Sequence, residues 1–99
     1  MWVAGGRLVL DFFNNTDMAL KKRNIDELCK EARRKFNISI VEVDAFDEPE
    51  KCAVGFSVTM PTHWNRAKAH GFVQKICKDL DETAFARVTS EHWELYSPE

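Results

Sequence analysis

The stretch KFNISIVEVDAFDEPEKCAVGFSVTM, from Lys35 to Met60, decides the fold. Residues Ile38–Ala45 are rich in β-branched side chains, and Cys52–Met60 alternates large apolar with small or polar residues, so both segments read as strands. The connection between them contains Pro49, which cannot donate a hydrogen bond to a neighbouring strand and therefore fits a turn. A strand, an acidic turn and a second strand predict a β-hairpin.

Helical patterns flank the hairpin. Met18–Phe36 repeats apolar residues at helical spacing, with Thr16 or Asp17 as the candidate N-cap and Asn37 at the end. After the hairpin, the segment PTHW opens a second helix, with Thr62 as its candidate N-cap. The buried stripe of this second helix is predicted to be Ala69, Phe72, Val73, Ile76 and Leu80.

Alternating segments at the two ends predict two further strands, Trp2–Phe13 and Ala84–Tyr96. The residues expected on one side of the last strand are Phe85, Arg87, Thr89, Glu91, Trp93 and Leu95. The resulting order βαββαβ predicts a ferredoxin-like α+β fold, in which a four-stranded antiparallel sheet carries two helices on one face. The 99 residues are expected to form one domain, residues 1–99.

The composition is that of an ordinary folded domain. Hydrophobic residues make up 44% and charged residues 30% of the chain, and the formal net charge is −2. These values exclude a disordered chain and a globally basic nucleic-acid binder, but they allow a local basic surface. No apolar run reaches the length of a membrane span, and the N-terminus has neither a basic region nor a cleavage site. We therefore expect a cytoplasmic protein without a membrane partner.

The spacing of the cysteines and histidines predicts neither a metal site nor a cofactor. Cys29, Cys52 and Cys77 are odd in number and widely separated, which is typical of buried small side chains in a reducing compartment. The three histidines also lack ligand spacing. No nucleophile or base accompanies the acidic residues of the hairpin, so we expect no catalytic residues and no enzyme activity.

The helix predicted over Met18–Phe36 is strongly basic, with seven Lys and Arg against three Asp and Glu, a net charge of +4. Because both helices are expected on one face of the sheet, their outward sides could combine into one positive surface for phosphate groups. The predicted RNA contacts are Lys21, Lys22, Arg23, Lys30, Arg33, Arg34 and Lys35, assisted by Lys68 and Lys75. The alternative is a charged outer face of the kind that any amphipathic helix uses to stay in solution.

The hairpin supplies the opposite charge. Glu42, Asp44 and Asp47 are predicted to bind a basic partner. In this second hypothesis the chain is a protein–protein interaction module without a nucleic-acid role, and it forms a homodimer through the open face of its sheet.

Over nearly its whole length, the sequence resembles the YlxP-like family of small bacterial proteins of unknown function. The resemblance is carried by KFNIS at Lys35–Ser39, EVD at Glu42–Asp44, and Asp47 in the hairpin. The family's usual hairpin sequence Asp-Leu-Trp-Gln-Arg is replaced here by Asp47–Lys51, so its Trp is missing. The resemblance implies a ferredoxin-like fold and a link to ribosomal RNA or a ribosome-assembly particle, because members are often encoded beside translation-initiation and ribosome-maturation genes. It brings no catalytic residues.

Overall fold

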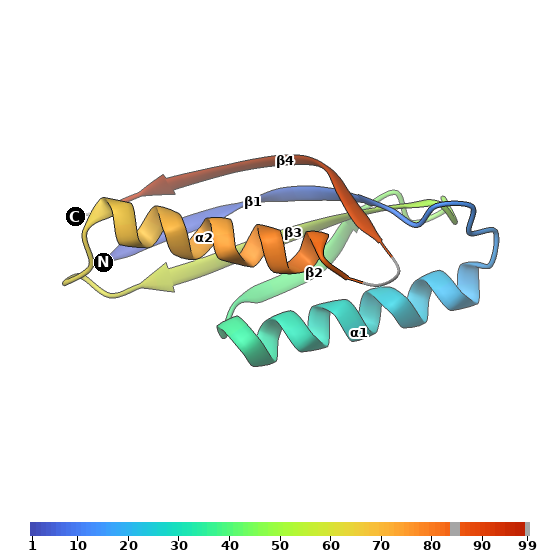
Figure 1. Ribbon diagram of the computed structural model, residues 1–99, viewed down its shortest axis with the longest axis horizontal. Helices are drawn as coiled ribbons and strands as arrows, with labels where there is room; N and C mark the ends of the chain where they lie inside the picture. Colours follow the sequence, from blue (N-terminus) through green and yellow to red (C-terminus); the bar gives the residue numbers. More distant parts are fainter. Residues whose placement is uncertain (84–85, 99) are drawn as a thin grey trace.

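The computed structural model describes residues 1–83 and 86–98. It contains β1 (Trp2–Asp11), α1 (Met18–Phe36), β2 (Ser39–Asp44), β3 (Lys51–Met60), α2 (Arg66–Asp81) and β4 (Arg87–Tyr96). The strands form one antiparallel sheet in the order β2-β3-β1-β4 (Figure 1). The predicted ferredoxin-like fold is therefore confirmed.

Both helices pack on the same face of the sheet. Ile25, Leu28 and Ala32 of α1 and Val73 and Ile76 of α2 belong to a single buried cluster with the inward residues of the strands. The inward residues that the strands contribute include Ala4, Leu8, Leu10, Ile40, Cys52, Val54, Phe56, Val58 and Met60. The two helices are offset along the long axis of the molecule, with α1 beside β2 and α2 nearer β4 (Figure 1).

Side-chain caps fix where the helices begin. Asp17 is the N-cap of α1, and its Oδ1 accepts hydrogen bonds from the backbone N–H groups of Ala19 and Leu20, at 2.9 and 3.2 Å. The predicted cap Thr62 of the second helix is wrong. Asn65 takes this place, accepting a hydrogen bond from Lys68 N at 2.8 Å, because the preceding residues form a turn instead of helix.

Asn37 ends α1 in the left-handed conformation, with φ 53°, and its backbone N–H donates to the carbonyl of Arg33. Asn is one of the few residue types that adopt this conformation at low cost. The helix end was therefore predictable from its sequence, and the bounds Met18–Phe36 are confirmed.

A β-bulge interrupts the pairing of β1 with β4. The successive β1 residues Val9 and Leu10 pair with Ser90 and Val88, so Thr89 is an extra residue in β4. An extra residue reverses the alternation of sides along a strand.

The bulge changes which residues of β4 face the core. Val88, Trp93 and Leu95 pack against the core, whereas Arg87 and Thr89 are exposed. The prediction that Arg87 and Thr89 lie on the same side of the strand as Trp93 is therefore wrong. The predicted start of this strand at Ala84, and the position of Phe85, lie outside the described residues.

The face of the sheet opposite the helices is largely polar. Arg7 lies in the middle of this open face and forms an ion pair with Asp44 at 3.1 Å, in which both side chains are exposed. On either side of β1, Ser57 and His92 are also exposed. The exposed apolar residues on this face include Val41 and Val43 on the edge strand β2 and Tyr96 at the end of β4.

Candidate functional site

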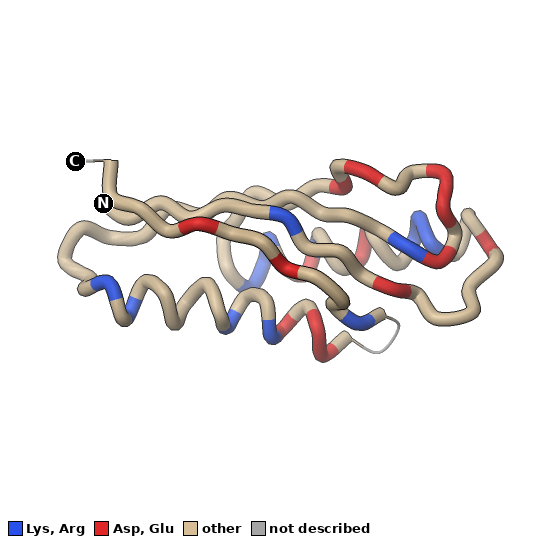
Figure 2. The backbone as a smooth tube through the Cα atoms, turned by 90° about the horizontal axis from the view of Figure 1, so that it is seen from above, with Lys and Arg blue, Asp and Glu red and all other residues tan. Residues whose placement is uncertain are grey.

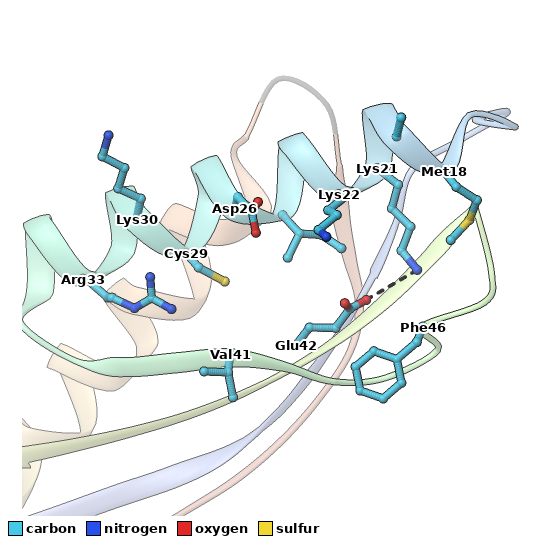
Figure 3. A pocket seen from close by; sticks show the side chains of 12 residues that line it. Met18, Lys21, Lys22, Asp26, Cys29, Lys30, Arg33, Val41, Glu42 and Phe46 are labelled. Carbon is cyan, nitrogen blue, oxygen red and sulfur yellow. Dashed lines mark ion pairs between the residues drawn. The ribbon is translucent and has the colours of Figure 1, made fainter.

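A groove with a volume of about 840 Å³ lies between α1 and the edge strand β2. Figure 3 shows side chains from both elements around it. Its lining residues are Met18, Ala19, Lys21, Lys22, Ile25, Asp26, Cys29, Lys30, Arg33, Val41, Glu42 and Phe46. The groove therefore combines apolar walls with several cations, and all of its lining residues come from α1, β2 and the start of the hairpin turn.

Four predicted cations line this groove, and three of them, Lys22, Lys30 and Arg33, are exposed. Arg33 donates a hydrogen bond from its guanidinium Nη2 to the carbonyl oxygen of Ile40, at 2.7 Å, and thereby ties α1 to β2. Lys22 and Lys30 are exposed, and neither forms an ion pair with a carboxylate among residues 1–83 and 86–98. Their charges are therefore available to an anionic ligand.

Lys21 does not belong to an exposed basic surface. Its side chain is only 2% exposed, and its ammonium group donates to the carbonyl oxygen of Ala45 at 2.6 Å. The same Nζ lies 3.4 Å from Oε2 of Glu42, a buried oxygen without a hydrogen-bond partner (Figure 3). The prediction that Lys21 contacts phosphate is thus wrong. A signal was present, because Lys21 lies one helical turn before the buried residue Ile25.

Some of the remaining predicted cations are already paired. Arg34 forms an ion pair with Glu31 at 2.8 Å, which also lowers the pKa of the Glu31 carboxyl. Lys35 pairs with Asp79 of α2 at 3.2 Å. All of these side chains retain solvent exposure, so the pairs are weak and could exchange partners.

The cations of the two helices do not form one continuous surface. The groove between α1 and α2 is lined by four acids, Glu27, Glu31, Asp79 and Glu82, against the single cation Lys35. This acidic seam, defined by those four acids, separates the basic side of α1 that faces β2 from the cations of α2. The expectation of one combined positive surface is therefore wrong, because the acids of the two helices meet in the groove between them.

The two assisting cations lie on α2. Lys68 sits over the ring of Trp64, 4.6 Å from the ring centroid, and Lys75 is exposed. Neither lines the groove between α1 and β2.

The three acids predicted to bind a partner have different surroundings. Glu42 faces the groove and Lys21, whereas Asp44 lies on the open face with Arg7. The hydrogen bond from the backbone N–H of Ala45, together with that from Arg7, lowers the pKa of Asp44. Asp47 is exposed in the turn. Figure 2 shows the acidic residues gathered at the hairpin end of the molecule.

The three cysteines are free and buried. Burial raises the pKa of the Cys52 thiol to about 12, with a further contribution from the charge of Glu42, and burial likewise raises that of Cys77 to about 11. Burial also raises the pKa of Cys29. The prediction of small buried side chains is confirmed.

Among the described residues, no group of three or more His, Cys, Asp and Glu side chains could hold a metal ion, and no helix is long and apolar enough to cross a membrane.

This chemistry predicts that all three thiols are unreactive in the folded protein. Only the thiolate reacts with disulfide reagents, and at mildly alkaline pH both the raised pKa values and burial keep its accessible amount very low. A coloured disulfide reagent should therefore report almost no thiol under native conditions and three thiols per chain in denaturant. Rapid reaction of one thiol without denaturant would contradict the observed burial.

Comparison with known proteins assigns a family but no activity. No curated protein matches the sequence. Residues 6–93, which include all or most of every helix and strand, match the family described as "Protein of unknown function (DUF503)". The chain therefore belongs to the DUF503 family.

Proposed function

We propose that the chain is a non-enzymatic cytoplasmic binding module that contacts the phosphate backbone of structured RNA through α1. The observation that carries this proposal is the row of exposed cations on α1 that have no carboxylate partner among the described residues, namely Lys22, Arg23 and Lys30. The resemblance to the YlxP-like family supports ribosomal RNA, or a ribosome-assembly intermediate, as the target.

The spacing of the cations suits a phosphate chain. Lys22 and Lys30 are eight residues apart, or about 12 Å along a helix that rises 1.5 Å per residue. This distance lets them reach different phosphates of one backbone, because each nucleotide of a strand carries a phosphate and neighbouring phosphates lie much closer together than the two lysines. The acidic seam and the acidic hairpin would repel the same backbone, and they therefore restrict it to the side of α1 that faces β2.

Salt dependence tests this proposal. Three phosphate contacts predict that log K for a structured fragment of ribosomal RNA falls by roughly 2 to 3 for a tenfold rise in salt. The double variant Lys22→Glu/Lys30→Glu should weaken binding by about tenfold or more and reduce that slope, because two contacts become repulsive. Fluorescence anisotropy over a salt series measures both quantities.

A matched control has the same change in net charge at a distant place. Lys51→Glu/Lys78→Glu alters two exposed lysines that do not line the groove. This control should bind RNA nearly as the unaltered chain does. Equal losses in the two double variants would point to net charge alone and would overturn an interface on α1, and so would binding that does not depend on salt.

A further inference from the structure

The strand β2 lies at the edge of the sheet. Most of the apolar side chains of β2 and of the turn after it are exposed. Val41 is 51% exposed, Val43 is 42% exposed, and Phe46 at the following turn is 55% exposed. One side of an edge strand has backbone groups without a partner strand, so it can pair with another chain. Exposed valines beside such an edge favour that pairing over contact with water.

Charges are ordered along this edge. The basic end of α1 lies at the start of β2, as the hydrogen bond from Arg33 to Ile40 shows. The acidic turn follows the other end of β2, where Asp47 and Glu48 are both exposed. One end of the edge is therefore basic and the other end acidic.

We propose that two copies of the chain associate through β2, edge to edge and antiparallel, about a two-fold axis. Such an axis exchanges the two ends of the strand, because an isologous contact uses the same surface on both copies. The basic end of each copy then meets the acidic end of the other. Near the axis, Val41 meets Val41 of the second copy. In this one arrangement, the charged ends and the apolar middle of the edge on one copy therefore match those on the other copy.

Two local features fit this pairing. The hydrogen bond from Arg33 to the carbonyl oxygen of Ile40 holds the basic end of α1 beside the start of β2. Arg34 is exposed, and its ion pair with Glu31 of the same helix is weak, so it can turn to an acid of the second copy at little cost. A register shift between Glu42 and Asp44 ends the regular part of β2 and limits the paired segment to a few residues. The contact is therefore small, and the dimer forms at high protein concentration.

This dimer differs from one formed through the open face of the sheet. The open face carries the Arg7–Asp44 ion pair and polar side chains such as Ser57, and it would have to lose their hydration. The test of this dimer is separate from the RNA test, because it alters Arg33, Arg34, Asp47 and Glu48, whereas the RNA test alters Lys22 and Lys30.

The mass in solution gives the first test. Light scattering at high concentration should approach twice the chain mass of 11.5 kDa and return to the single mass on dilution. A strict monomer over the whole range would overturn the proposal.

Charge reversal identifies the interface. Arg33→Glu/Arg34→Glu and Asp47→Lys/Glu48→Lys should each be monomeric, because each brings like charges together. An equimolar mixture of the two variants should form dimers again, since every contact in the mixed pair joins opposite charges. If the unaltered chain dimerises and the mixture does not, the charged ends do not meet, and the proposal fails. Circular dichroism checks that both variants fold.

A second pair of variants does not depend on these charges. Val41→Lys places a charge on the exposed edge and should abolish the dimer, as edge lysines do in natural sheets. Thr59→Lys places the same charge at an exposed position of the open face and should leave the dimer intact. Loss of the dimer in both variants would assign the contact to the open face, on which Val41 also lies, and would overturn the edge contact. A dimer that survives Val41→Lys would overturn it as well.

Discussion

Replacing Lys21 with methionine is expected to lower the free energy of unfolding by about 3 kcal/mol, because it leaves a buried carboxylate without its cation. The ammonium group of Lys21 lies 3.4 Å from Oε2 of Glu42, an oxygen that is shielded from solvent. It also donates to the carbonyl of Ala45, which would lose its 2.6 Å hydrogen bond. Methionine fills a similar volume, so the loss reports the charge more than a cavity. Denaturant titration followed by tryptophan fluorescence measures the change.

The double variant Lys21→Met/Glu42→Leu separates the ion pair from packing. Glu42→Leu alone leaves the buried ammonium group without its carboxylate and should also destabilise the fold. The double variant removes both charges and should recover a large part of the lost free energy of unfolding. The double-mutant cycle should therefore give a coupling of about 1–3 kcal/mol. Strictly additive effects would show that Lys21 and Glu42 stabilise the fold independently.

Replacing Gly6 with alanine is expected to destabilise the fold by about 3 kcal/mol or more, because a side chain there meets the backbone of β4. A Cβ atom on Gly6 would collide with the carbonyl oxygen of His92 and with Cβ of Trp93. A backbone atom cannot move aside without opening the β1–β4 pair. Thermal unfolding should show a drop of many degrees, and amide exchange in β4 should accelerate.

Gly71→Ala is the matched control. It makes the same change at an exposed position inside α2, where nothing lies within 4 Å of the added atom. Alanine is favoured over glycine within a helix by about 0.5–1 kcal/mol, so this variant should be more stable than the unaltered chain. A gain at Gly6, or a large loss at Gly71, would contradict the geometry of these two sites.

Local patterns were enough to predict most of the fold. The caps of α1, its apolar stripe and the alternation in β3 are all encoded in short segments, and the structure confirms them except at Met18, the first residue of the predicted stripe, which is exposed. The bulge at Thr89 was not predictable in this way. It depends on how β4 aligns with β1, a strand about eighty residues earlier, and the sequence around Thr89 contains no glycine or proline that would mark it.

The candidate site was less predictable than the fold. The exposure of Lys22 and Lys30 follows from their charge, but the burial of Lys21 does not. Lys21 lies on the buried side of α1, and its charge alone does not show this. The acidic seam could not be predicted from either helix alone, because Glu31 and Asp79 meet only when α1 and α2 pack together. The groove beside β2 likewise depends on how far α1 stands from the edge of the sheet.

The buried thiols can report local unfolding of the elements that contain them. Cys29 lies in α1, Cys52 in β3 and Cys77 in α2, so one thiol belongs to each of three elements. A buried thiol is modified only when its element transiently separates from the rest. Identical pulse-labelling rates at the three sites would mean that the elements open as one cooperative unit, and different rates would rank the local stability of α1, β3 and α2 without any engineered probe.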